Sequence, residues 1–181
     1  MSEELFKEYQ EPFQHWTVDN FLTNECLAEL KQIEHRNEQA EKGRRVNSHR
    51  LFVHNMPEKA VPCLWELQRG ISDGPYRLFF EKVTGQSFEG TFPRIEIISD
   101  YGEFELQPHH DHLEKKLSAM IYTDHEELYP ATVLGDDYQV EAKDNRCMFF
   151  VPSKDTWHHY PKTNFTKVRR GLMINYWTYK V

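Results

Sequence analysis

The chain has 181 residues, a length that fits one domain with a sizeable hydrophobic core. Its 29 acidic and 22 basic residues give a net charge of −7, which argues against a broad basic surface for nucleic acid. No basic segment followed by an apolar stretch opens the chain, and no apolar run approaches transmembrane length. We therefore expect a soluble, cytoplasmic protein.

The three cysteines are Cys26, Cys63 and Cys147. They are far apart, odd in number and without CxxC spacing, so neither a disulfide framework nor a cysteine zinc site is expected. Free thiols in a reducing compartment are the prediction.

The first half of the chain is predicted to be mainly helical. Thr23 is placed to cap a helix, because apolar side chains recur at helical spacing after it. The polar stretch 36–50 predicts the tail of that helix and an exposed loop. Two further helices are expected at 59–71 and 75–83, and Gly85 would end the second.

From about residue 92 the chain consists of short β-rich runs separated by turn residues. Helices followed by many short strands predict an α+β domain, in which the helices cover one face of an antiparallel sandwich or jelly roll. We expect a single domain over 1–181, with 1–90 as a mainly helical support region and 91–181 as the jelly-roll core that carries a metal site. The predicted strands are 94–98, 117–123, 131–134, 138–142, 147–151 and 168–177.

Two histidines and a carboxylate in the β-rich half predict the metal site. His109 and Asp111 are two positions apart, so on a strand both side chains project to the same side and can reach one ion. The third ligand is His158 or His159, since only one of these neighbours can point inward. Two histidines and one carboxylate on one face of an octahedral ion leave three positions open, as in non-heme Fe(II) oxygenases.

Two other interpretations of these residues remain open. Histidines are common on polar surfaces, so the cluster at 109–112 can be incidental. Two histidines and a carboxylate also suit catalytic zinc, and a basic residue further along the chain is what favours iron.

That basic residue lies on the predicted strand 168–177, whose two faces differ. One face is apolar and fit to pack on helices, while the face that carries Arg169 is partly polar and suits a barrel interior with a charged ligand. A buried arginine needs a partner, and a carboxylate held by two guanidinium N–H groups is the natural one. We therefore predict Arg169, rather than Arg170, as the anion-binding residue.

Tyr122 on the predicted strand 117–123 shares a face with Ser118 and Met120. If this face lines the same interior, the phenol can donate a hydrogen bond to the bound carboxylate. The alternative is a core tyrosine whose hydroxyl is satisfied by the backbone.

In their order along the chain, these segments resemble the Fe(II)/2-oxoglutarate-dependent dioxygenases, in particular their prolyl 4-hydroxylase-like branch. The resemblance covers about residues 92–177 and extends loosely to 18–22, which looks like the opening segment of that branch. The matching segments are Tyr101-Gly102, Pro108-His109-His110-Asp111, Ile121-Tyr122-Thr123-Asp124, Phe149-Phe150-Val151-Pro152, Thr156-Trp157-His158 and Arg169-Arg170-Gly171-Leu172.

The resemblance implies a double-stranded β-helix with iron at one mouth. It implies that His109, Asp111 and His158 are the iron ligands and catalytic residues, that Arg169 binds the distal carboxylate of 2-oxoglutarate, and that Tyr122 assists. The implied enzyme is a hydroxylase that uses Fe(II), 2-oxoglutarate and dioxygen to oxidise a C–H bond of a small molecule or a peptidyl residue, and releases succinate and CO₂.

The sequence departs from the family pattern at two places. Gly171 stands where the family often has serine, so one hydroxyl contact to the co-substrate is missing or supplied elsewhere. Pro130-Ala131-Thr132 stands where Gly-Gly or Gly-Thr is common, which affects the substrate side. Asp111 is present, so the halogenase variant of the family is not indicated.

Two alternatives to the hydroxylase remain: a cupin-type metal enzyme that does not use 2-oxoglutarate, and a non-enzymatic metal-binding module on the same fold. Arg94, Met173 and Asn175 are candidate pocket residues. The polar loops 36–50 and 124–129 are candidates for a lid. The sequence predicts neither the primary substrate nor the oligomeric state.

Overall fold

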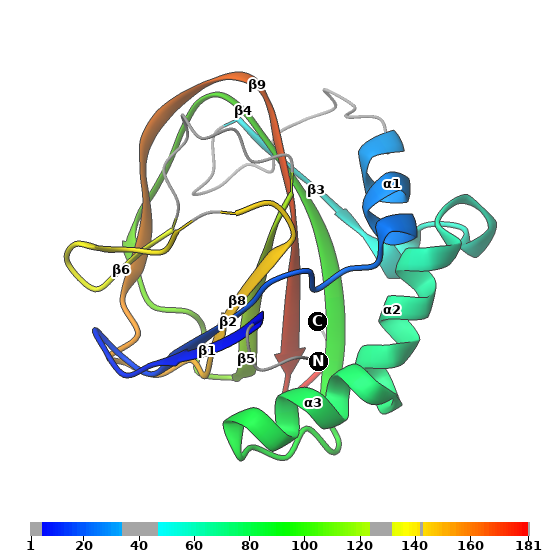
Figure 1. Ribbon diagram of the computed structural model, residues 1–181, viewed down its shortest axis with the longest axis horizontal. Helices are drawn as coiled ribbons and strands as arrows, with labels where there is room; N and C mark the ends of the chain where they lie inside the picture. The colour runs from blue at the N-terminus through cyan, green and yellow to red at the C-terminus, as the bar shows by residue number, and fades with distance from the viewer. Residues whose placement is uncertain (1–4, 34–46, 124–131, 142, 181) are drawn as a thin grey trace.

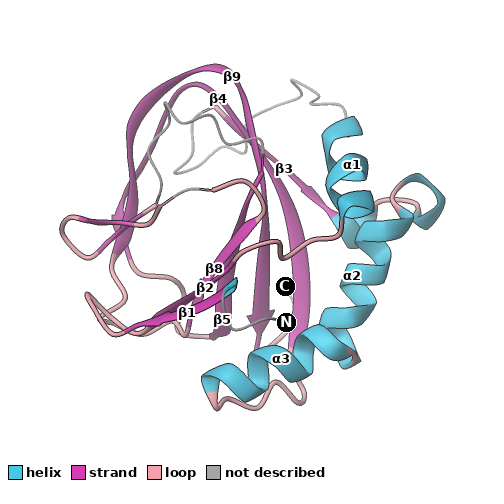
Figure 2. Cartoon of the chain, viewed as in Figure 1, coloured by secondary structure: helices cyan, strands magenta, loops and turns pink. Residues whose placement is uncertain are grey.

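The computed structural model describes residues 5–33, 47–123, 132–141 and 143–180. In these residues a curled antiparallel sheet carries helices on one side (Figures 1 and 2). The elements are β1 (Phe6–Tyr9), β2 (His15–Val18), α1 (Asn24–Gln32), β3 (Ser48–Phe52), the 3₁₀ turns Val53–Asn55 and Glu58–Ala60, α2 (Pro62–Asp73), α3 (Pro75–Thr84), β4 (Phe92–His109), β5 (Lys115–Thr123), β6 (Val133–Leu134), β7 (Tyr138–Gln139), β8 (Arg146–Phe150) and β9 (His158–Trp177).

The strands form one sheet in the order β1-β2-β8-β5-β9-β4-β3, and β6 joins β9 and β7 off this path. The longest strands, β4 and β9, pair with each other along most of their length, and register shifts interrupt their ladder between Asp100 and His109. Such irregularities increase the local twist and bend a strand. Figure 1 shows both strands bending over together, which curls the sheet. The predicted α+β jelly roll is confirmed.

Alternation along the central strands divides the interior into two sides. The helix side contains the main hydrophobic cluster, in which Tyr176 stacks on Phe88 and donates a hydrogen bond from its hydroxyl to the Ile71 carbonyl oxygen at 2.7 Å. The opposite side of the same strands faces the inside of the curled sheet, as the two-faced pattern of 168–177 predicts. The side chains of β5 and β9 that pack on the helix side are Leu117, Ala119, Ile121, Leu172, Ile174 and Tyr176.

The three predicted helices are present. Thr23 caps α1, because its hydroxyl oxygen accepts a hydrogen bond from the Cys26 amide at 3.3 Å. Gly85 ends α3 in the left-handed conformation, at φ 68°. Among the residues described, no helix has the length and apolar character that crossing a membrane requires.

The view of residues 1–90 as mainly helical is incomplete, because β1, β2 and β3 extend the sheet at both edges. β3 begins at Ser48, inside the stretch 36–50 that was expected to be a helix tail and loop; residues 36–46 lie outside the described part of the chain. β1 and β3 do not alternate between apolar and polar residues, and β2 has only four residues, so their strand signal is weak. Their strand conformation is stabilised by pairing: β1 pairs with β2, β2 with β8, and β3 with β4.

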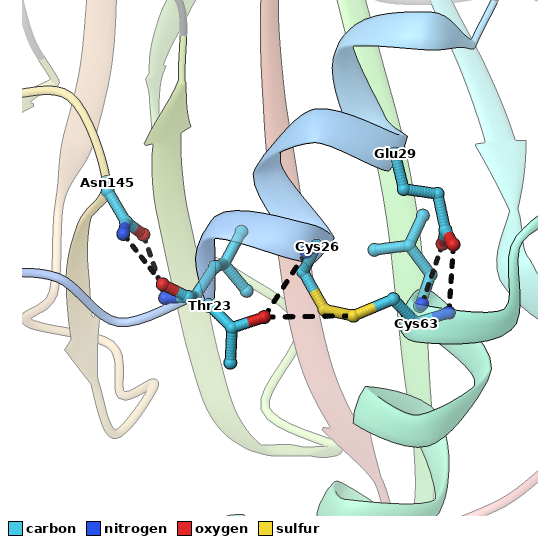
Figure 3. Close-up of a disulfide and its surroundings, with 7 residues drawn as sticks. Thr23, Cys26, Glu29, Cys63 and Asn145 are labelled. Carbon is cyan, nitrogen blue, oxygen red and sulfur yellow. Dashed lines mark hydrogen bonds between the residues drawn. A yellow bond between two sulfur atoms is a disulfide. The ribbon is translucent and has the colours of Figure 1, made fainter.

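The prediction of three free thiols is wrong for two of them. Cys26 at the start of α1 and Cys63 at the start of α2 form a disulfide, with their Cα atoms 5.2 Å apart (Figure 3). On the next turn of α1, the Glu29 carboxylate accepts hydrogen bonds from the backbone N–H groups of Cys63 and Leu64 at 2.9 and 2.8 Å. These bonds cap the N-terminus of α2. Cys147 is free and buried, and burial raises the pKa of its thiol.

The disulfide was missed because the two cysteines are 37 positions apart and the chain between them gives no pairing signal. Disulfides persist mainly in oxidising environments, so the argument for a reducing compartment loses its basis.

Reduction of this disulfide is expected to lower the free energy of unfolding by about 3 to 4 kcal/mol, because the bond closes a long loop of the unfolded chain. Urea unfolding with and without dithiothreitol measures the difference. The matched control is the double variant Cys26→Ala and Cys63→Ala, which keeps Cys147 and should not respond to the reductant. Equal stability of the wild type under both conditions would contradict the expectation.

Candidate functional site

His109, Asp111 and His158 come together at the mouth of the curled sheet. One ligand atom from each side chain lies within 4.8 Å of the other two. His109 ends β4 and His158 begins β9, and the two are direct partners in the β4–β9 ladder. Their ring centroids are 4.3 Å apart. A set of two imidazoles and one carboxylate at this spacing can hold one metal ion.

Both histidines are oriented by a backbone carbonyl group. Nδ1 of His109 donates to the Gln107 oxygen at 2.8 Å, and Nδ1 of His158 donates to the Thr156 oxygen at 3.0 Å. A neutral imidazole that donates through Nδ1 presents the lone pair of Nε2, the form that a metal requires. Burial lowers the pKa of both rings, which favours this neutral form.

The Asp111 carboxylate is ionised although only 8% of the residue is exposed. Burial by itself would raise its pKa, but the neighbouring Lys115 ammonium, His158 and a hydrogen bond from Ser118 hold that pKa at about 2. Lys115 Nζ lies 2.9 Å from Oδ1, and Ser118 Oγ donates to Oδ2 at 2.6 Å. Both partners therefore fix the orientation of the carboxylate.

The neighbouring histidines take other positions. His110 packs the edge of its ring against Trp157, with centroids 5.3 Å apart. His159 lines the cavity described next, but the structure brings His158 rather than His159 into the cluster with His109 and Asp111.

A cavity inside the curled sheet connects this cluster with Arg169. It is lined by the three candidate ligands and by Asp100, Arg169 and apolar side chains that include Ile98 and Met120. Arg170 is not among the lining residues. The structure therefore places Arg169, the predicted anion-binding residue, on the same cavity as the candidate metal ligands.

Arg169 already has a carboxylate partner within the protein. Its Nε and Nη2 groups both donate to Oδ2 of Asp100, its direct partner across the β4–β9 ladder, and the Nε contact is 3.0 Å. Ser48 donates to the other oxygen of Asp100 at 2.6 Å. Asp100 therefore supplies the carboxylate partner that a buried arginine needs, so Arg169 does not have to take this partner from a ligand.

The Arg169 side chain nevertheless keeps one edge for a ligand. Among the described residues, no acceptor is hydrogen-bonded to Nη1, so the edge formed by Nη1 and Nη2 can receive a second carboxylate. The guanidinium lies 4.3 Å from the centroid of the Tyr160 ring, which holds it in place. Burial alone would lower the pKa of Arg169, but Asp100 raises it above its ordinary value, so the group is charged.

Tyr122 lies beneath the cavity wall and does not line it. Its hydroxyl donates to Oγ1 of Thr132 at 2.9 Å, and Thr132 is a lining residue. Burial raises the pKa of Tyr122 to about 12, so the phenol stays protonated. Thr132 therefore contacts the phenol through its side chain and its backbone, and the role of Tyr122 toward a bound carboxylate stays a prediction.

Gly171 has a structural reason to differ from serine. A Cβ atom at this position would lie 2.9 Å from the Ile121 carbonyl oxygen and 2.6 Å from the end of the Met120 side chain. The backbone contact cannot easily give way, because β5 and β9 are paired at this point.

Outside the cavity, a second cleft of about 890 Å³ opens beside His109 and Asp111. Basic and aromatic side chains gather on its wall, among them Arg94, Trp157 and Trp177. His109 and Asp111 thus line both the cavity and the cleft.

Asp100 and Lys115 are the polar residues of the site that sequence reasoning missed. Asp100 shares a face of β4 with Arg94, Glu96 and Ile98, and three charged residues on one face of a strand were a usable signal. Lys115 gave no such signal, because its contact with Asp111 depends on the turn that joins β4 to β5.

No family model matches the chain, and no curated protein matches it by sequence. Its fold is similar to that of several solved structures. A 2OG-Fe(II) oxygenase family oxidoreductase from Burkholderia pseudomallei is 13% identical with a TM-score of 0.65, covering 98% of this chain and 86% of the other.

Two further structures show the same fold. A prolyl hydroxylase from Trichoplax adhaerens, in complex with a hypoxia inducible factor peptide fragment, is 11% identical with a TM-score of 0.64, over 91% of this chain and 83% of the other. HygX from Streptomyces hygroscopicus, with nickel and 2-oxoglutarate bound, is 8% identical with a TM-score of 0.61, over 90% and 82%. At these identities the likeness concerns the fold.

Proposed function

We propose that this protein is an Fe(II)- and 2-oxoglutarate-dependent dioxygenase that hydroxylates a C–H bond. The observation that carries the proposal is the placement of His109, Asp111, His158 and Arg169 on one cavity. The fold likeness to 2-oxoglutarate oxygenases agrees with it. A structural metal alone would need no buried arginine with an unused edge beside it.

The residues present fit the implied groups. His109 and His158 would ligate Fe(II) through Nε2 and Asp111 through a carboxylate oxygen, and Arg169 would bind the distal carboxylate of 2-oxoglutarate through its Nη1–Nη2 edge. When bound, iron and 2-oxoglutarate supply the oxidation of a C–H bond by dioxygen, with release of succinate and CO₂.

The protein's own contribution is orientation and exclusion of water. Lys115 and Ser118 hold the Asp111 carboxylate, and Asp100 and Tyr160 hold the Arg169 guanidinium. The apolar part of the cavity lining keeps water away from the reacting atoms. Tyr122 would act through Thr132, which lines the cavity and accepts its hydrogen bond.

The proposal includes several points beyond the site. We treat residues 1–181 as one domain, since the strands before residue 90 belong to the same sheet as those after it. The substrate is taken to be a small molecule or a peptidyl residue, and no nucleic acid partner is expected from the acidic composition.

One observation favours a second candidate, a cupin-type metal enzyme that does not use 2-oxoglutarate. Asp100 neutralises Arg169 in the structure, so the cavity does not require a further anion. The two candidates differ in whether 2-oxoglutarate binds beside the metal.

Anaerobic titration of the Fe(II)-loaded protein with 2-oxoglutarate separates them. We expect the weak visible charge-transfer band of the bidentate iron chelate to appear and saturate. Succinate, which lacks the keto oxygen, is the matched control and should give no band. Tight Fe(II) binding without a band would support the cupin-type enzyme instead.

A further inference from the structure

The open cleft beside the candidate metal ligands carries an excess of positive charge. Its charged lining residues are three cations, Arg50, Arg94 and Lys115, and two carboxylates, Glu96 and Asp111. Both oxygens of Asp111 are engaged by Lys115 and Ser118. The net charge of the cleft wall therefore depends on how Arg50 and Arg94 share the negative charge of Glu96.

Glu96 is a buried carboxylate shared by both arginines. Its Oε2 atom accepts a hydrogen bond from Nη1 of Arg50. Its Oε1 atom accepts hydrogen bonds from Arg94 and, at 3.0 Å, from the side-chain amide of Asn175. Burial by itself would raise the pKa of Glu96, but Arg50 and Arg94 keep it lowered, so the carboxyl is ionised. Two guanidinium groups share one negative charge here, and one positive charge is left over.

Arg94 presents that charge in a fixed geometry. Nε and Nη2 donate to Oε1 of Glu96 at 3.1 and 2.7 Å. The guanidinium lies 4.9 Å from the centroid of Phe52 and 5.4 Å from that of Trp177, so aromatic rings hold it in place. Within the described part of the chain, no acceptor is hydrogen-bonded to Nη1. The Nη1–Nη2 edge is therefore left to a ligand.

The rest of the cleft suits an apolar skeleton. Trp157 is 46% exposed and Trp177 forms part of the wall. A volume of about 890 Å³ is large enough for a small organic molecule beside the metal ligands. A planar carboxylate matches the two parallel N–H groups of a guanidinium edge better than a neutral amide does.

We propose that the primary substrate is a small organic acid whose carboxylate is bound by the Nη1–Nη2 edge of Arg94, with its apolar part against Trp157 and Trp177. This inference rests on the proposed function, because it assigns the cleft to the substrate of the same metal site. Arg94 would then determine specificity, while Arg169 serves the co-substrate.

Tryptophan fluorescence tests the anion site, since two tryptophans line the cleft. The metal-free protein is titrated with phenylacetate and with phenylacetamide, which share a skeleton and differ in charge. We expect the acid to bind on the order of tenfold more tightly, the effect of a charge-assisted hydrogen-bonded pair. Arg94→Gln should abolish the preference, and Arg94→Lys should restore only part of it.

The control variant is Arg69→Gln, an exposed arginine paired with Glu58 and away from the cleft, which should keep the preference. Equal binding of acid and amide, or a preference that survives Arg94→Gln, would overturn the proposal. Tighter binding of phenyl phosphate than of phenylacetate would overturn the assignment to a carboxylic acid.

The charge-transfer band of iron with 2-oxoglutarate distinguishes a failure of the acid-substrate proposal from a failure of the proposed dioxygenase function. A band without an acid preference leaves the dioxygenase intact and removes the acid substrate. An acid preference without a band shows an anion site that is not a dioxygenase substrate site, and also overturns the inference.

Discussion

The His158→Ala variant is expected to lose at least about 100-fold in Fe(II) affinity. Removal of a residue that only hydrogen-bonds to a metal ligand costs about 10- to 100-fold, and removal of a ligand itself should cost more. No charge-transfer band should form with 2-oxoglutarate, and decarboxylation of 2-oxoglutarate should fall to background. Calorimetric titration with Fe(II) under anaerobic conditions measures the affinity directly. The imidazole of His158 is buried against Phe150, with centroids 5.1 Å apart. A thermal unfolding experiment on the variant should therefore check that the loss of affinity is not a loss of folded protein.

His159→Ala is the matched control for this variant. The two histidines are neighbours on β9 and both line the cavity, but His159 lies outside the cluster of candidate ligands. It should bind Fe(II) nearly as the wild type does. A greater loss of metal affinity in His159→Ala than in His158→Ala would show that the assignment of the third ligand is wrong.

The Arg169→Gln variant is expected to bind 2-oxoglutarate on the order of 100-fold more weakly, because it loses the charged edge that would hold the distal carboxylate in the proposed function. Fe(II) binding should persist, since Arg169 is not one of the candidate ligands. The measurement is the 2-oxoglutarate dependence of the charge-transfer band. Arg170→Gln removes the neighbouring arginine, which does not line the cavity, and should leave that dependence unchanged.

Loss of Arg169 also leaves Asp100 buried without its cation, which is expected to cost about 3 kcal/mol of stability. The double variant Asp100→Asn with Arg169→Gln removes both charges and should recover part of that stability. It should not recover 2-oxoglutarate binding. Recovery of binding in the double variant would mean that Arg169 acts through the fold and not through its free edge.

The sequence was sufficient to group His109, Asp111 and His158 and to place Arg169 on the inner face of its strand. The reason given for Asp111 does not hold, because β4 ends at His109 and Asp111 follows the strand. The alternation around Arg169 is a local pattern, and the structure follows it. The helix cap at Thr23 and the helix end at Gly85 belong to the same class of local signals.

The partners of these residues could not be predicted in the same way. The pairing of Arg169 with Asp100 depends on the register of two long strands, and shifts in their ladder are invisible in the sequence. The contact of Lys115 with Asp111 depends on a turn, and the disulfide depends on how two helices pack. All three are tertiary contacts, and the local sequence around each residue is compatible with more than one partner.

The β4–β9 ladder links the two halves of the site. His109 with His158 forms one of its pairs, and Asp100 with Arg169 forms another. The spacing between the candidate metal ligands and Arg169 is therefore set largely by hydrogen-bonded backbone. In the proposed function, this fixed spacing would limit the chain length of the dicarboxylic acid that reaches both ends. A residue inserted into or deleted from β4 between these pairs would turn the following side chains to the other face of the strand, so we expect it to separate the two halves of the site and not to adjust their spacing.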